Sequence, residues 1–173
     1  IMVKVIKLKI EHLVVGRIRT NCYIVKKDNK CIIIDPGDEA SRIKEACKDY
    51  EVEEILVTHH HWDHILALEE LEEYYHIKHN TFLRKTFKYE IIKTPGHASD
   101  SLTFYFKGEK VMFTGDFLFY HTIGRYDLET SSVKDMIQSL EEISKYPDDI
   151  IIYPGHGIDS ILGEEKKYFN SYF

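Results

Sequence analysis

The sequence Thr58-His59-His60-His61-Trp62-Asp63-His64 carries four of the ten histidines in this chain of 173 residues. It directly follows residues 54–58, a short apolar run that predicts a β-strand. The histidines are therefore expected on a loop at the end of a strand, where binding and catalytic residues concentrate. Taken alone, the run also fits an exposed polar loop or a fortuitous metal binder without function.

The spacing within this loop favours a metal site. Side chains alternate along an extended segment, so His59 and His61 are expected to point one way while His60 points elsewhere. Two imidazoles held side by side suit a borderline cation such as Zn²⁺. Asp63 and His64 then supply one oxygen and one nitrogen to a neighbouring position.

Three further turns each place one potential ligand just after a predicted strand. They are Thr94-Pro95-Gly96-His97 after residues 87–92, Thr114-Gly115-Asp116 after residues 111–113, and Pro154-Gly155-His156-Gly157 after residues 150–153. Glycine at such a turn allows a sharp bend and a close backbone approach. Four strand ends that deliver histidine or aspartate to one rim would hardly result from core packing alone. The four segments together therefore predict one shared metal site.

Composition limits the class of protein. The chain has 23 basic and 29 acidic residues and a net charge of −6, so it lacks the cationic surface of a general nucleic-acid binder. Its apolar runs are far shorter than the ~20 residues that cross a bilayer, and residues 1–7 are not the unbroken apolar stretch of a signal peptide. Three cysteines without a CxxC pair argue against a disulfide framework. We expect one soluble, cytoplasmic domain over residues 1–173, without nucleic-acid or membrane partners.

Strands outnumber helices in the expected secondary structure, and several strands pair as hairpins. The β-prone segments are residues 2–10, 22–26, 30–34, 54–58, 87–92, 102–106, 111–114 and 150–153. Helical spacing of apolar residues occurs at 39–50 and 65–75, and a short last helix is expected at 164–172. A further helix, capped by Ser131 or Ser132, is expected to bury the stripe Val133, Met136, Ile137, Leu140 and Ile143. This order favours an α/β (α+β) fold, with mixed sheets and helices on their outer faces.

The histidine-rich stretch resembles a family signature. Residues 59–64 match the HxHxDH motif of the metallo-β-lactamase superfamily, and His97, Asp116 and His156 follow in the order that the family shows. The segments Asn21-Cys22-Tyr23 and Ile34-Asp35-Pro36-Gly37 look like its early strands and loop. Asp116 followed by Ile123-Gly124-Arg125-Tyr126-Asp127-Leu128 is most similar to glyoxalase II-like (hydroxyacylglutathione hydrolase-like) enzymes. The resemblance implies an αββα sandwich, in which two mixed sheets pack face to face and hold a dinuclear centre between their edges.

The resemblance also implies the ligands of two divalent metal ions, most readily Zn²⁺, with Fe²⁺ or Mn²⁺ as other options. The first ion takes His59, His61 and His97, the second takes Asp63, His64 and His156, and Asp116 bridges the two. Asp35 corresponds to a family position that supports a ligand from the outer shell rather than binding metal itself.

The activity that the resemblance implies is hydrolysis of a small-molecule thioester or related ester. Metal binding lowers the pKa of water to roughly 7, so a metal-bound hydroxide can attack the carbonyl carbon at neutral pH. Asp63 and Asp116 are the carboxylates expected at the reaction centre. A bridging hydroxide needs no further deprotonation, so Asp63 fits the role of a ligand better than that of a general base.

Substrate contacts and the exact reaction stay open at this point. Arg125 could hold a substrate carboxylate through its planar guanidinium, or pair on the surface with Asp127 or Glu129. Tyr126 is a candidate wall of the cleft, with simple packing as the alternative. Only 16 residues follow Gly157, so we expect no helical glutathione-binding domain at the C-terminus. A mononuclear iron persulfide dioxygenase and a non-catalytic metal-binding module remain alternatives.

Overall fold

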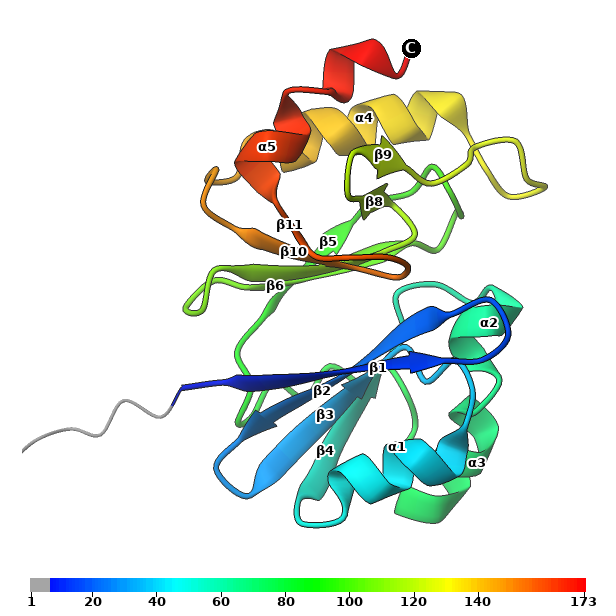
Figure 1. Ribbon diagram of the computed structural model, residues 1–173, viewed down its shortest axis with the longest axis vertical. Helices are drawn as coiled ribbons and strands as arrows, with labels where there is room; N and C mark the ends of the chain where they lie inside the picture. The colour runs from blue at the N-terminus through cyan, green and yellow to red at the C-terminus, as the bar shows by residue number, and fades with distance from the viewer. Residues whose placement is uncertain (1–6) are drawn as a thin grey trace, which may run out of the picture. The chain divides into compact units, whose positions relative to one another are not determined.

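The computed structural model describes residues 7–173, which form two compact units (Figure 1). Unit 1 contains the chain up to Val57 together with His61–Lys88. Unit 2 contains Thr58–His60 together with Tyr89–Phe173. The histidine-rich stretch is therefore divided between the units, because the chain passes from unit 2 to unit 1 at the peptide bond between His60 and His61.

Unit 1 is built on a four-stranded mixed sheet in the order β1-β2-β3-β4. Its strands β1, β2 and β3 are antiparallel, whereas β4 is parallel to β3. The segments expected at 22–26 and 30–34 do pair as a hairpin, and Asp28 in its turn lies in the left-handed region at φ 56°. The strands are Lys9–Val15, Thr20–Lys27, Lys30–Ile34 and Glu51–Leu56, and the helices α1, α2 and α3 are Ala40–Cys47, Trp62–Ile65 and Leu68–Tyr75.

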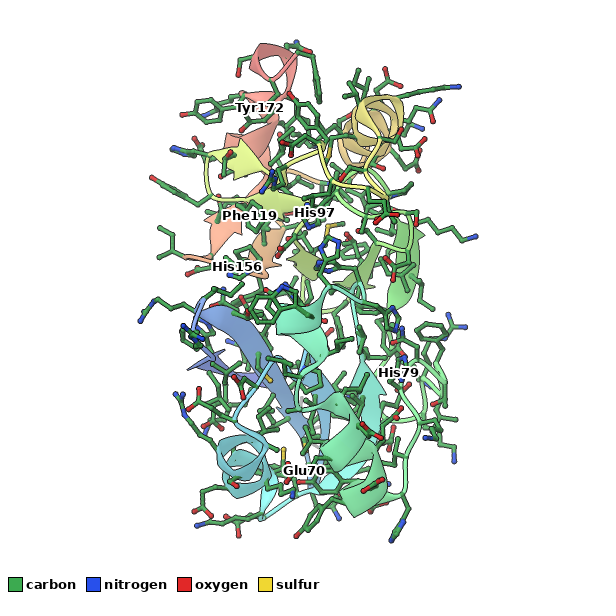
Figure 2. All side chains as sticks on the ribbon, turned by 90° about the vertical axis from the view of Figure 1, so that its right-hand side faces the viewer. Glu70, His79, His97, Phe119, His156 and Tyr172 are labelled. Carbon is green, nitrogen blue, oxygen red and sulfur yellow. The ribbon has the colours of Figure 1, made fainter. Side chains whose placement is uncertain are left out.

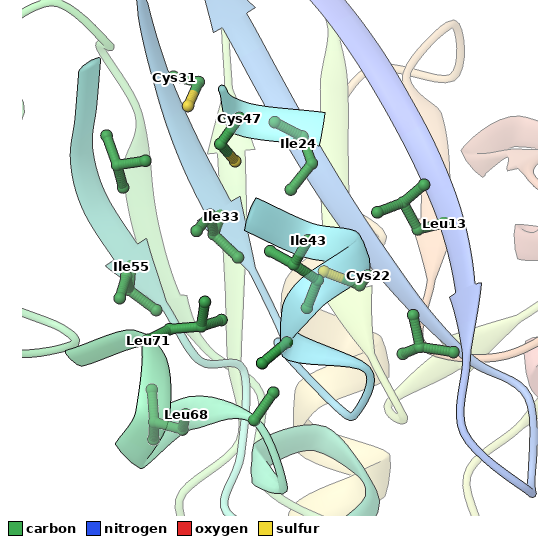
Figure 3. Packing of buried hydrophobic residues seen from close by; sticks show 14 of the residues in the cluster. Leu13, Cys22, Ile24, Cys31, Ile33, Ile43, Cys47, Ile55, Leu68 and Leu71 are labelled. Carbon is green, nitrogen blue, oxygen red and sulfur yellow. The ribbon is translucent and has the colours of Figure 1, made fainter. Parts of the chain in front are cut away.

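The core of unit 1 lies between one face of this sheet and helices α1 and α3 (Figure 3). Alternate residues of the strands point toward the helices, where they pack against apolar residues of α1 and α3 that are one helical turn apart. The buried set includes Leu13, Cys22, Ile24, Cys31, Ile33, Ile43, Cys47, Ile55, Leu68 and Leu71. The three cysteines are free thiols in this core, and burial raises the pKa of the Cys22 thiol well above its usual value.

Unit 2 contains a five-stranded mixed sheet in the order β11-β10-β7-β6-β5, with only β7 and β10 parallel. The strands β5, β6, β7, β10 and β11 are Glu90–Lys93, Leu102–Phe106, Val111–Gly115, Ile151–Pro154 and Ser160–Ile161. A separate small hairpin pairs β8 (Leu118–Phe119) with β9 (Thr122–Ile123). Helices α4 (Val133–Ile143) and α5 (Leu162–Lys166) precede a final 3₁₀ turn at Phe169–Ser171. Among residues 7–173, no helix has the length and apolar character that crossing a membrane needs.

Helix α4 packs on the sheet of unit 2 through Met136, Leu140 and Ile143, which are buried. Its N-cap is Ser132, whose side chain accepts a hydrogen bond from the Asp135 amide. Ser132 is one of the two caps that the sequence predicted. The wider stripe predicted for this helix is wrong at two positions, because Val133 and Ile137 are 44% and 36% exposed. Both lie one row to the side of the buried positions, so the sheet covers a narrower strip of the helix than the pattern suggests.

The fold class is confirmed, since two mixed sheets each carry helices, while some boundaries differ from expectation. Of the strand expected at 2–10, residues 1–6 lie outside the described part, and the described strand runs from Lys9 to Val15. The helix expected at 65–75 begins at Leu68 as α3, and the short α2, which ends at Ile65, was not expected. The helix expected at 164–172 is α5, which ends at Lys166, followed by a 3₁₀ turn. Strands β8, β9 and β11 were not expected, because two-residue strands leave no periodic pattern. One domain over residues 1–173 stays a prediction.

Removing the cap of α4 tests the role of Ser132. We expect Ser132→Ala to lower the free energy of unfolding by about 1 kcal/mol, because the Asp135 amide loses its acceptor. The melting temperature should fall by about 2–4 °C in differential scanning calorimetry. The matched control is Ser144→Ala at the other end of the helix, where the exposed hydroxyl only donates to the Glu141 carbonyl. Equal effects of the two changes would contradict the cap assignment.

Candidate metal centre

Unit 1 contributes two neighbouring donors from the single turn of α2. Asp63 and His64 lie on that turn and are only 8% and 0% exposed. His64 Nδ1 lies 2.9 Å from Asp35 Oδ2, and because a carboxylate only accepts, Nδ1 carries the proton. In the neutral ring, the lone pair of His64 is therefore on Nε2, which is 3.3 Å from Asp63 Oδ2. Two acceptor atoms this close together in a buried place favour a cation between them.

Strand β2 and the loop after β3 hold the helical turn α2 in place. Thr20 on β2 donates its hydroxyl to Asp63 Oδ2 at 2.9 Å, and the Ala67 amide donates to the Pro36 carbonyl at 3.1 Å. Gly37 has to be glycine, because a Cβ there would stand 2.2 Å from the Asp63 carbonyl oxygen. Asp35 sits in the left-handed region at φ 53° and is buried. It contacts His64 as the resemblance implies, and its role as a support of a metal ligand stays a prediction.

Unit 2 gathers one carboxylate and three imidazoles. Asp116 Oδ2 lies 3.4 Å from Nε2 of His156, 3.6 Å from that of His97 and 4.0 Å from that of His59. These distances exceed a good N–H···O hydrogen bond, which is about 2.7–3.2 Å long. They approach the separation of about 3.4 Å that two donors have on one tetrahedral ion with bonds of about 2.0–2.1 Å. Figure 2 shows His97 and His156 in this unit. The described chain thus offers histidine and aspartate groups that could hold metal.

Contacts on the far side of the rings orient these imidazoles. His97 Nδ1 donates to the Arg125 carbonyl oxygen at 2.9 Å, because a carbonyl can only accept. This leaves the lone pair of His97 on Nε2, the atom nearer to Asp116. The ring of His59 approaches the Thr58 hydroxyl, with 3.1 Å between Nδ1 and Oγ1. The Leu102 amide donates to the Thr58 carbonyl at 2.8 Å and so holds this segment beside the start of β6.

Glycine at two turns allows the close packing of these ligands. A Cβ on Gly124 would stand 1.8 Å from the Asp116 carbonyl oxygen and 2.9 Å from the His97 Cβ. Gly115, at φ 53°, lets the turn after β7 pass the side chain of Thr58, which a Cβ would approach to 2.3 Å. The backbone around Asp116 is therefore packed so closely that neither Gly115 nor Gly124 can be replaced by a residue with a Cβ without a shift of the chain.

The other histidines of the stretch have different surroundings. His60 is exposed, and both its amide and its Nδ1 bond to Asp100 Oδ2, at 3.1 and 2.7 Å. The expected alternation is thus confirmed for the buried His59 and the exposed His60. His61 is the N-cap of α2 in unit 1, with an extended backbone. The sequence did not indicate Thr20 or Asp100, because single side chains far along the chain carry no motif.

The two candidate substrate contacts have partners within unit 2. The side chain of Arg125 is 64% exposed, and it donates to both oxygens of Asp127 at 2.7 and 3.0 Å. This pair raises the pKa of Arg125 and lowers that of Asp127. The Tyr126 ring lies 5.4 Å from that of Phe173. The surface ion pair considered as the alternative for Arg125 is therefore present, and substrate contact by either residue stays a prediction.

Comparison with known proteins identifies the family. Residues 15–82 and 77–156 match the sequence model of the metallo-β-lactamase superfamily, which covers most of the chain. The chain belongs to this superfamily.

Individual proteins and solved structures of similar sequence and fold add detail to the family assignment. The chain is 29% identical to hydroxyacylglutathione hydrolase GloC of Haemophilus influenzae, over 92% of this chain and 96% of that protein. It is 28% identical to the probable metallo-hydrolase YqgX of Bacillus subtilis, over the same shares. Among solved structures, BLEG-1 B3 metallo-β-lactamase has a TM-score of 0.85 at 26% identity, covering 92% of this chain and 97% of that one. A di-iron-bound form of TTHA1623 has a TM-score of 0.81 at 25% identity, covering 90% and 96%.

The close backbone packing at Asp116 can be tested by replacing Gly124, which lies against the Asp116 carbonyl. We expect Gly124→Ala to lower the free energy of unfolding by about 1–3 kcal/mol or more, because the added Cβ overlaps the Asp116 carbonyl. Denaturant unfolding should be followed in the presence of a chelator, so that bound metal does not contribute to stability. Gly108→Ala is the matched control, since a Cβ there meets nothing within 4 Å. A loss no larger than that of the control would show that the turn relaxes freely.

Proposed function

We propose that this protein is a dinuclear metal-dependent hydrolase of the glyoxalase II-like type, which cleaves a thioester or related ester. The observation that carries the proposal is the surroundings of Asp116, where one carboxylate oxygen faces three imidazole nitrogens at 3.4–4.0 Å. Membership of the metallo-β-lactamase superfamily supports it independently.

The donor set fits two divalent ions. Imidazole nitrogen and carboxylate oxygen are ligands that Zn²⁺, Fe²⁺ and Mn²⁺ all accept. We propose that one ion is held by His59, His61 and His97, the other by Asp63, His64 and His156, and that Asp116 is shared. Zn²⁺ is the proposed metal, and the di-iron-bound relative makes Fe²⁺ its main competitor.

The bound ions would supply Lewis acidity toward the substrate carbonyl and a water whose pKa is lowered to roughly 7. The protein's own contribution is to present ligand atoms in a fixed protonation state. Asp35 keeps the proton of His64 on Nδ1, and the Arg125 carbonyl does the same for His97. Both imidazoles therefore offer Nε2 as a donor without a change of tautomer.

Asp63 acts in this proposal as a ligand and not as a general base. Its Oδ2 already accepts the hydroxyl proton of Thr20 and lies 3.3 Å from His64 Nε2. A hydrogen bond from a neutral donor favours the ionised carboxylate, which is the form that binds metal. Relatives named hydroxyacylglutathione hydrolase support a thioester as the substrate class.

Replacing the shared carboxylate tests the proposal. We expect Asp116→Ala to reduce metal content below that of the unaltered protein and thioester hydrolysis by more than about 100-fold, the upper end for an outer-shell partner. Metal is measured by elemental analysis of protein purified without added metal, and hydrolysis by release of free thiol. Asp149→Ala is the control, because Asp149 forms an exposed ion pair with Lys110. Normal turnover in Asp116→Ala would refute the shared ligand.

Metal content and hydrolysis, measured on the unaltered protein, distinguish the hydrolase from a dioxygenase and from a non-catalytic binding module. Two zinc ions per chain with thioester cleavage support the hydrolase. One iron per chain, with oxygen uptake on a persulfide, would establish the dioxygenase instead. Two tightly held metal ions without turnover on a broad panel of esters and thioesters would indicate a binding module.

The supporting carboxylate gives a test that does not depend on turnover. We expect Asp35→Asn to weaken metal binding by about 10–100-fold, because an amide no longer fixes the proton on His64 Nδ1. Metal affinity is measured by competition with a chromophoric chelator, and the tautomer by ¹⁵N chemical shifts of the imidazole in the metal-free protein. Asp49→Asn, at an exposed position of the same unit, should change neither. An unchanged His64 tautomer in Asp35→Asn would remove the supporting role.

A further inference from the structure

A groove of about 480 Å³ opens in unit 2 beside His156. It is lined by Phe119, Tyr120, Thr122, His156, Gly157 and Ile158, and none of these residues is a Lys, Arg, Asp or Glu. Its volume lies within the range of about 300–1,000 Å³ that small-molecule sites have.

One wall of the groove is the histidine proposed to bind metal. The ring of His156 is 6.3 Å from that of Phe119, and Figure 2 shows both side chains in this unit. His156 Nε2 also lies 3.4 Å from Asp116 Oδ2. A molecule in the groove therefore touches the same imidazole that belongs to the candidate centre.

The opposite walls leave the groove open to a ligand. Ile158 is 60% exposed, so its apolar side chain is available to a ligand in the groove. Gly157, at φ 79°, turns the chain, and a Cβ there would meet nothing within 4 Å.

A buried carboxylate holds the hairpin that forms the aromatic wall. Glu165 on α5 is buried, and its Oε2 accepts a hydrogen bond from the His121 amide at 2.9 Å. Its Oε1 accepts another from the Ser160 hydroxyl. The His121 ring is stacked at 3.9 Å on that of Tyr120 and lies 4.6 Å from that of Tyr168. Because the turn between β8 and β9 is fixed from several sides, the groove is formed before any ligand arrives.

We infer that this groove binds an uncharged apolar group of the substrate, an alkyl or aryl arm, against His156, Phe119 and Ile158. The inference rests on the proposed function, since it assigns the arm to the thioester hydrolysed at the neighbouring centre. The lining contains no Lys, Arg, Asp or Glu, so a charged arm finds no ion-pair partner among the other five residues beside His156. An apolar arm instead covers the exposed faces of Ile158 and Phe119.

Two substrate series test which arm occupies the groove. One varies the acyl group from acetyl to octanoyl on a fixed small thiol, and the other varies the thiol on a fixed acetyl group. We expect kcat/KM to rise along one series, by at most about fourfold for each added methylene. Ile158→Asp should flatten that rise. The control is Ile161→Asp on β11, which is also exposed, at 48%, but does not line the groove, and it should keep the full slope.

A binding measurement keeps the groove testable without catalysis. Linear alkanols from butanol to octanol are titrated into metal-free protein with ¹³C-labelled isoleucine methyl groups. The Ile158 methyl signal should shift, with affinity increasing along the series, while that of Ile161 stays in place. If no thioester is cleaved by metal-loaded protein, the proposed function fails and this titration alone decides the groove. An unmoved Ile158 signal, or equal slopes for Ile158→Asp and Ile161→Asp, would overturn the inference.

Discussion

Imidazole nitrogens and carboxylate oxygens crowd together in the buried parts of both units, and this constraint shapes the structure around them. In unit 1, His64 Nε2 faces Asp63 Oδ2 at 3.3 Å, and in unit 2, His97 Nε2 faces Asp116 Oδ2 at 3.6 Å. Each imidazole has its proton on the opposite nitrogen, because a carboxylate or a carbonyl holds it there. Lone pairs that face one another in a medium of low dielectric repel strongly, and a cation between them reverses the sign of that interaction.

Such crowding requires unusually close backbone packing, which glycine supplies. Gly37 lies under the Asp63 carbonyl and Gly124 under that of Asp116, each at a distance where no Cβ fits. The two glycines come from different loops and different units, but each allows the chain to pass close to the carbonyl of an aspartate. A ligand on a short turn can be aimed only if the chain beside it takes up little space. The glycines therefore belong to the binding apparatus as much as the donors do.

Sequence patterns predicted the parts of this arrangement that are local. The motif at residues 59–64 is recognisable from its cluster of histidines after a predicted strand, and the turns at His97, Asp116 and His156 from a glycine or proline after a strand. The contacts that orient the donors could not be predicted. Thr20 reaches Asp63 across 43 residues, and the partner of His97 is a backbone carbonyl, which any residue could provide. Helix α4 shows the same limit, because periodicity gives the apolar face but not how much of it the sheet covers.

The buried Glu165 shows how an element outside the metal centre can still determine its chemistry. A carboxyl group away from water is costly unless hydrogen bonds compensate it, and here a backbone amide and a hydroxyl do so. Since the amide belongs to His121, at φ 53° in the turn between β8 and β9, the side chain of Glu165 on α5 holds the conformation of that turn. The turn in turn carries Phe119 and Tyr120 into the wall of the groove beside His156. The shape of the proposed groove therefore depends on helix α5, which carries none of the proposed metal ligands, whereas the proposed ligands His97, Asp116 and His156 follow the ends of strands.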